Sequence, residues 1–214
     1  MLAIVQARCS SKRFPNKILK IVYDKPLIHH VILKLLKSKK ISKIIVATSN
    51  HKSDEKLVKY LKKIKVEFFR GSLQNVAKRI LDLALLKKKK FFIRISGDSP
   101  LIDYKLVDQA ISIFNKNKKY DLVTNIFPRS FPKGQSVEII RTNMLKKHIH
   151  KMTKLEKEHV TKYFYKHSKN FYIKNFRNKL KTQFIKLAVD NKTDLTKILK
   201  KLDKKKFKNY SIYD

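Results

Sequence analysis

Glycine is nearly absent from this chain, which has 3 glycines among 214 residues. So few glycines cannot build a glycine-rich backbone loop around phosphate groups. The two best-known phosphate patterns, G-x-G-x-x-G after the first predicted strand and G-x-x-x-x-G-K-[ST], are both missing. Any phosphate that this chain binds must therefore be held by charged side chains.

Cysteine and long apolar runs are also scarce. The single cysteine, Cys9, excludes an internal disulfide and suits a reducing compartment. No apolar segment approaches the length of a membrane span. The first apolar run is too short for a signal peptide and leads directly into polar residues. We therefore expect a cytoplasmic protein without membrane insertion.

Acidic residues are few, since 16 Asp and Glu face 53 Lys and Arg, for a net charge of +37. Such a charge is typical of a nucleic-acid-binding protein, which is one candidate function. The alternative is a compositional bias that places lysine on every exposed face. We favour this alternative because the lysines spread over the whole chain, without a helix-turn-helix, zinc-finger or RNA-recognition pattern. We expect no specific nucleic-acid partner.

Apolar runs alternate with amphipathic segments, which predicts an α/β fold with a mostly parallel sheet flanked by helices. The whole chain, 1–214, is expected to form one domain with a loosely packed tail from about 204. The expected strands are 2–5, 41–48, 66–69, 91–95, 121–125, 137–140 (antiparallel) and 184–189. The expected helices are 26–36, 54–64, 73–86, 104–114, 142–150, 156–165 and 191–202.

A basic loop follows the first predicted strand. The apolar residues 2–5 lead into a loop with the cations Arg8, Lys12, Arg13 and Lys17. Ligands of open α/β sheets bind beyond the carboxyl ends of the strands, so the loop is placed to receive an anion. The alternative is a solvated basic turn in a lysine-rich chain.

Two aspartates lie at the ends of predicted strands, Asp98 after 91–95 and Asp190 after 184–189. In a parallel sheet both would open on the edge that carries the basic loop. Mg²⁺ prefers one or two carboxylates together with phosphate oxygens and water. The pair therefore predicts a magnesium site, with the two carboxylates within about 8 Å of each other. The alternative for each Asp is a helix N-cap.

Five blocks of the sequence, in this order and spacing, resemble the sugar-nucleotide cytidylyltransferases. This family includes the CMP-Kdo and CMP-sialic acid synthetases, and the SpsF branch of spore-coat polysaccharide proteins is the most similar. The blocks are R-x-x-S-x-R-x-P-x-K at 8–17, RGS with a helix at 70–79, RISGDSPLID at 94–103, EHVTKYFY at 158–165 and LAVDNKTDL at 187–195.

The resemblance implies a Rossmann-like nucleotide-diphospho-sugar transferase domain that moves CMP from CTP to a sugar hydroxyl and releases pyrophosphate, for surface polysaccharide biosynthesis. It implies Mg²⁺ as cofactor, held by Asp98 and Asp190. The implied catalytic residues are Arg8, Lys17, Asp98 and Asp190. The implied nucleotide-binding residues are Arg8, Ser11, Arg13, Lys17, Arg70, Ser72 and Asp98.

The acceptor side is less defined by the resemblance. Asn125, Glu138 and His159 are the expected contacts to the sugar, and for His159 a homodimer interface or core packing is the alternative. The chain departs from the SpsF pattern at Gln74 and Asn75, where acidic residues are usual, and at Ser136, where G-x-D-V-E has a carboxylate. Another nucleotide, or a glycosyltransferase reaction on the same fold, therefore stays open.

Overall fold

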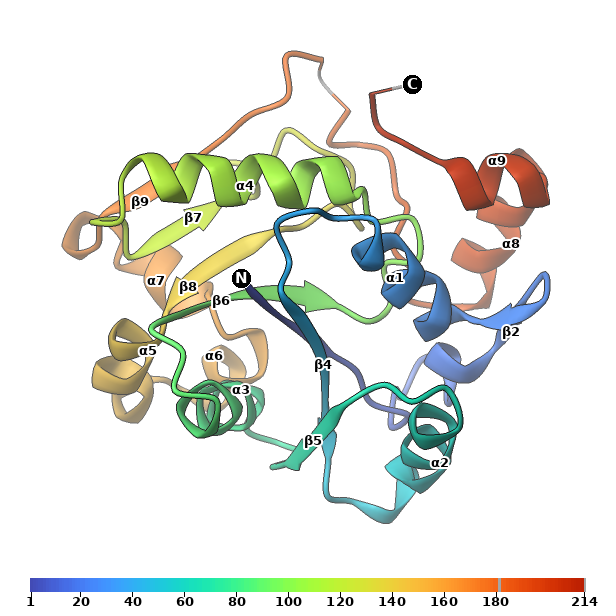
Figure 1. Cartoon of the computed structure of the whole chain (residues 1–214), viewed down its shortest axis with the longest axis horizontal. Helices are drawn as coiled ribbons and strands as arrows, with labels where there is room; N and C mark the ends of the chain where they lie inside the picture. The colour runs from blue at the N-terminus through green and yellow to red at the C-terminus, as the bar shows by residue number, and fades with distance from the viewer. Residues whose placement is uncertain (181, 214) are drawn as a thin grey trace.

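The computed structural model describes residues 1–180 and 182–213. Its centre is a seven-stranded sheet in the order β5-β4-β1-β6-β8-β7-β9 (Figure 1). Strand β8 is antiparallel to β6 and β7, and the other neighbours are parallel, so the predicted α/β fold with a mostly parallel sheet is confirmed. The strands are β1 Leu2–Gln6, β4 Lys43–Ser49, β5 Phe68–Gly71, β6 Phe91–Ser96, β7 Leu122–Thr124, β8 Glu138–Arg141 and β9 Ile173–Asn175.

Helices cover both faces of the sheet, as buried parallel strands require. The buried side chains form two clusters, one under α1, α2, α4, α8 and α9, the other under α3, α5 and α7. Strand β1 supplies both clusters, since Val5 belongs to the first and Leu2 and Ile4 to the second. The helices are α1 Leu27–Leu36, α2 Glu55–Lys63, α3 Val76–Leu86, α4 Tyr104–Lys116, α5 Thr142–His148, α6 Lys154–His159, α7 Lys162–Lys166, α8 Lys192–Lys201 and α9 Lys204–Asn209. No described helix is long and apolar enough to cross a membrane.

The helix expected over 156–165 is two helices. It is interrupted at Val160, which has φ 41° and is fully buried. The amide of Thr161 donates to the carbonyl of His159 over 2.5 Å, which makes residues 159–161 a tight γ-turn. A β-branched residue at positive φ is strained. The strained turn lies between Glu158 and Thr161, and it is invisible in the apolar spacing.

The strand expected at 184–189 is absent, and the seventh strand of the sheet is instead β9. Phe184 is 80% exposed, so the apolar run does not form a buried strand. Only an isolated bridge joins Lys186 to Lys133. The segment runs beside loops, because the amide of Leu187 donates to the Lys133 carbonyl at 2.7 Å and that of Val189 to the Asp98 carbonyl at 2.9 Å.

The tail after 204 is packed, contrary to the sequence expectation. Residues 204–209 form α9, in which Phe207 is 1% exposed. Its ring packs edge-on against Tyr23 and His30, with centroids 5.5 and 5.0 Å away. These partners lie near the start of the chain, so the lysine-rich local sequence of α9 gives no sign of them.

Replacement of Phe207 by Ala should lower the free energy of unfolding by about 3–5 kcal/mol, because it removes a fully buried ring. The matched change Phe184→Ala removes an exposed ring and should shift it by less than about 0.5 kcal/mol. Urea unfolding followed by circular dichroism measures both. Equal effects of the two changes would contradict the packing of α9.

Candidate active site

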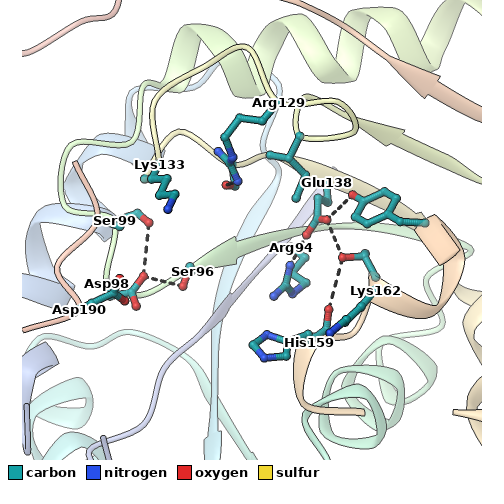
Figure 2. A pocket seen from close by; sticks show the side chains of 16 residues that line it. Arg94, Ser96, Asp98, Ser99, Arg129, Lys133, Glu138, His159, Lys162 and Asp190 are labelled. Carbon is teal, nitrogen blue, oxygen red and sulfur yellow. Dashed lines mark hydrogen bonds and ion pairs between the residues drawn. The ribbon is translucent and has the colours of Figure 1, made fainter. Parts of the chain in front are cut away.

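Two neighbouring cavities open at the edge where β1, β4, β5 and β6 end and the antiparallel β8 begins. The larger one, of about 1260 Å³, is lined by residues 6–8, 10–13 and 17–18 of the basic loop region, by the turn before α3 and by α6. The smaller one, of about 530 Å³, lies between β6, β8 and the loop 126–136 (Figure 2). The residues that line both cavities are Arg94, Ser96, Asp98, His159 and Asp190.

A buried carboxylate fixes the start of the basic loop. Asp54, fully buried at the start of α2, accepts the amide of Cys9 at 2.6 Å and the amide of Ser49 at 3.0 Å. The loop after β1 is therefore tied to the end of β4. Burial, with Asp54 beside it, raises the pKa of the Cys9 thiol to about 12, so this cysteine is no nucleophile at neutral pH.

The ammonium group of Lys17 brings the two predicted aspartates together. It lies 2.6 Å from Asp98 Oδ2 and 3.9 Å from Asp190 Oδ1, and it donates to the Val189 carbonyl at 2.8 Å. The two carboxylate oxygens are at most the sum of the first two distances apart, within the expected limit of about 8 Å. Asp98 also accepts from Ser96 Oγ at 2.7 Å. Asp190 lies at the end of the segment 187–190, which is not a strand and runs beside the loops that contain Lys133 and Asp98.

The other predicted loop residues line the larger cavity. Arg8 Nη2 lies 2.6 Å from Glu158 Oε1, and Arg8 Nη1 donates to the Leu73 carbonyl at 3.3 Å. Arg13 is mostly exposed and stands 3.5 Å from Asp190, and Ser11 lies on the same wall. The cations of the loop thus surround one space large enough for a nucleotide.

Two predicted nucleotide contacts, Arg70 and Ser72, lie outside these two cavities. Arg70 pairs with Glu55 at 2.6 Å and donates to the Ser49 carbonyl at 3.1 Å. Ser72 Oγ accepts the amide of Asn75 at 3.0 Å and so shapes the turn before α3.

Asn125, expected as a sugar contact, is fully buried. Its amide donates to the Gln135 carbonyl at 2.7 Å and accepts from the Val137 amide at 3.0 Å. It therefore braces the loop that borders the smaller cavity. Because its side chain is buried and both of its polar atoms are hydrogen-bonded within the protein, it is not accessible to a ligand.

Glu138 and His159 do line the smaller cavity. Glu138 is 1% exposed and accepts from Arg94, from Thr161 Oγ1 at 2.7 Å and from the Tyr165 hydroxyl at 2.5 Å. Burial and the neighbouring Glu138 raise the pKa of Tyr165 well above its ordinary value. His159 is exposed and borders both cavities, which rules out core packing.

Three cations of the smaller cavity were not singled out by the sequence. Arg129, Lys133 and Lys162 line it (Figure 2). Among the described residues, none of the three has a carboxylate within 4.0 Å. Arg129 donates to the Pro132 carbonyl at 3.3 Å and to Ser136 Oγ at 3.0 Å, both neutral groups. Burial lowers its pKa. In a chain with 53 Lys and Arg, no local signal distinguishes these three.

The sequence pattern of the cytidylyltransferase family matches residues 2–212. The chain belongs to the cytidylyltransferase family. It is therefore a nucleotidyltransferase, and the glycosyltransferase alternative is wrong.

Relatives of this cytidylyltransferase match over most of its length. An uncharacterized protein of Methanocaldococcus jannaschii, MJ1063, is 32% identical over 91% of this chain and 79% of its own. The spore coat polysaccharide biosynthesis protein SpsF of Bacillus subtilis is 28% identical over 92% of this chain and 84% of its own. The structure of a cytidylyltransferase from Leptospira borgpetersenii has a TM-score of 0.86 at 27% identity, covering 100% of this chain and 99% of that one. The Rossmann-like fold and the resemblance to the SpsF branch are thereby confirmed.

The described residues supply too few ligands for a metal site closed by protein groups alone. Within residues 1–180 and 182–213, no group of three or more His, Cys, Asp and Glu could hold a metal ion. Asp98 and Asp190 offer two carboxylates, which fits a Mg²⁺ ion that takes its remaining oxygens from water and phosphate.

The bridging role of Lys17 predicts a loss of stability when its charge is removed. Lys17→Met should lower the free energy of unfolding by about 1–3 kcal/mol, because it leaves the Asp98 carboxylate without its cation. Lys20→Met, at an exposed lysine three residues away, is the matched control.

The double variant Lys17→Met with Asp98→Asn should recover most of this loss, since the uncompensated charge is then gone. Urea unfolding of the unaltered protein, of Lys17→Met, of Asp98→Asn and of the double variant gives the coupling free energy. Strictly additive effects would show that the two side chains do not depend on each other.

Proposed function

We propose that this cytidylyltransferase transfers CMP from CTP to a hydroxyl of an anionic sugar, for surface polysaccharide biosynthesis. The acceptor oxygen bonds to the α-phosphorus, the bond from that phosphorus to the bridging oxygen of the β-phosphate breaks, and pyrophosphate leaves. The hydroxyl proton goes to solvent. The observation that carries the proposal is that two cavities, one lined by the basic loop and one by separate cations, share a border at Asp98 and Asp190.

The larger cavity suits the nucleotide. Arg8, Arg13 and Lys17 would hold the triphosphate, with Ser11 beside them. Arginine offers a planar fork and lysine a point charge to phosphate oxygens, so the loop replaces the backbone cradle that a glycine-poor chain lacks. Positioning and charge neutralisation, rather than a covalent intermediate, are the main needs of phosphoryl transfer.

Asp98 and Asp190 would hold Mg²⁺ between the two cavities. The ion would supply charge neutralisation at the triphosphate and lower the pKa of a bound hydroxyl. Lys17 now lies between these carboxylates. In the complex with nucleotide its ammonium group would turn to the phosphates. The Mg²⁺ ion would then neutralise the two carboxylates in its place.

The smaller cavity suits an acceptor with a negative charge. Glu138 is already paired with Arg94, and the carboxylates of Asp98 and Asp190 face Lys17. These carboxylates therefore leave the cations Arg129, Lys133 and Lys162 available to bind an anion. A carboxylate or phosphate on the sugar would form ion pairs with them, whereas a neutral sugar would not.

Pyrophosphate release tests the reaction. The protein with CTP and Mg²⁺ should release pyrophosphate when a sugar acid or sugar phosphate is added, and not with CTP alone. Asp98→Asn and Asp190→Asn should each lower the rate by at least about 100-fold. Asp24→Asn, at a surface carboxylate outside both cavities, should leave it unchanged. Activity near that of the unaltered protein in either site variant would sink the metal assignment for that residue.

Ser136 tests the charge of the acceptor. Ser136→Asp places a carboxylate beside the Arg129 guanidinium and should raise KM for the anionic sugar about 10-fold or more, the equivalent of about 1.4 kcal/mol. The neutral change Ser136→Asn is the control for size. KM for CTP should stay constant in both. Equal KM values for the sugar in the two variants would rule out Arg129 as its anion contact.

A further inference from the structure

An exposed loop with apolar side chains follows β9, the edge strand of the sheet. We call residues 177–180 and 182–186 the apolar loop, in which Phe184 is 80% exposed, Leu180 69% and Ile185 39%. Figure 1 shows the chain after β9, in orange, rising away from the strand to the upper edge of the molecule. Single exposed apolar residues are common, but three on one short loop indicate an interaction surface.

The apolar loop is folded and held at both ends. The amide of Asn178 donates to Ser130 Oγ at 2.8 Å, and the amide of Lys133 donates to the Ile185 carbonyl at 3.0 Å. Between these anchors, the amide of Ile185 donates to the Thr182 carbonyl at 3.0 Å and closes a tight turn. Hydrogen bonds to the loop 126–133 therefore fix the place from which the apolar side chains are presented.

The charge around the apolar loop has one sign. No Asp or Glu occurs between Glu158 and Asp190 in the sequence. Lys174, Arg177 and Lys179 are exposed, and in the part of the chain that the structure describes none of these three has a carboxylate within 4.0 Å. This surface therefore combines apolar side chains with unpaired cations.

We propose that the apolar loop docks on the surface of a membrane that contains anionic lipids. Its three apolar side chains would enter the boundary between head groups and acyl chains, and the three cations would contact lipid phosphates. This is contact with one surface of the bilayer and not a span across it. The proposal goes beyond the cytidylyltransferase reaction and does not depend on it.

The chemistry of the loop favours a membrane over two other partners. A second copy docked through the same loop would bring the same cations face to face, and like charges repel. A nucleic acid would pair with the cations and stack a base on Phe184, but it offers no apolar surroundings to Leu180 and Ile185. A membrane with anionic lipids supplies negative charge and an apolar layer together, so it fits the whole set.

A single tryptophan tests the contact, because the chain has no tryptophan of its own. Phe184→Trp keeps a large aromatic side chain at the docking position. Leu86→Trp is the matched control, since Leu86 is 64% exposed and precedes the lysines 87–90 on the opposite face of the sheet from α1. The vesicles are phosphatidylcholine with and without phosphatidylglycerol, at physiological ionic strength.

With the anionic vesicles, the emission of Phe184→Trp should shift to shorter wavelength and be quenched by brominated acyl chains. With phosphatidylcholine alone it should not change, and Leu86→Trp should not respond to either. Equal responses of the two variants to anionic vesicles would show that the net charge of +37 adsorbs the protein without a defined face, and would overturn the proposal.

Vesicle cosedimentation supplies a second measurement without a reporter. The double change of Leu180 and Phe184 to Ser should lower affinity for the anionic vesicles about 10- to 100-fold, because it removes two apolar side chains from the contact. The same change at Leu36 and Leu86, which are 65% and 64% exposed, is the control and should leave it unchanged. Unaltered vesicle affinity of the first variant would overturn the proposal, and a simultaneous change of its oligomeric state would assign the loop to a second copy.

Discussion

One ammonium group, that of Lys17, joins the parts of the molecule on which the site depends. It meets Asp98 at the end of β6, Asp190, and the carbonyl of Val189. Without a cation at this point, two carboxylates and a carbonyl would converge on a partly buried spot and repel one another. The Lys17 side chain, which is only 12% exposed, therefore links the loop after β1 to the end of β6 and to the segment 187–190, which the Val189 amide already joins to the Asp98 carbonyl.

Much of the fold was predictable because it is encoded locally. The buried β1, β4 and β6 are short apolar runs, and α1 to α4 have helical apolar spacing bounded by capping residues such as Asp103. The predictions failed where contacts with residues distant in the sequence decide whether a side chain is buried. Phe184 belongs to an apolar run but lies in solvent, while Phe207 sits in a lysine-rich segment and is buried by partners near the start of the chain. A strained turn at Val160 has no signature in the spacing.

The candidate site divides in the same way. Residues in ordered motifs, such as Lys17 and Asp98, could be picked from the sequence because motif and strand end coincide. The sequence predicts that Asp190 lies near Asp98, as the structure shows, but from a wrong premise, since no strand leads to Asp190. Arg129 could not be picked, because what sets it apart from other cations of the chain is its half-buried place beside a cavity, and such a place is decided only by the tertiary structure.

The site joins segments that lie far apart in the sequence. Arg8 and Glu158 are 150 residues apart, and Lys17 and the Val189 carbonyl 172 apart. During synthesis the loop is therefore made before Glu158 and Val189, the residues that Arg8 and Lys17 contact. Contacts between such distant segments slow folding. A nascent chain that has not reached residues 187–190 lacks the carbonyl and the carboxylate that contact Lys17, so these contacts form only after that segment has been made.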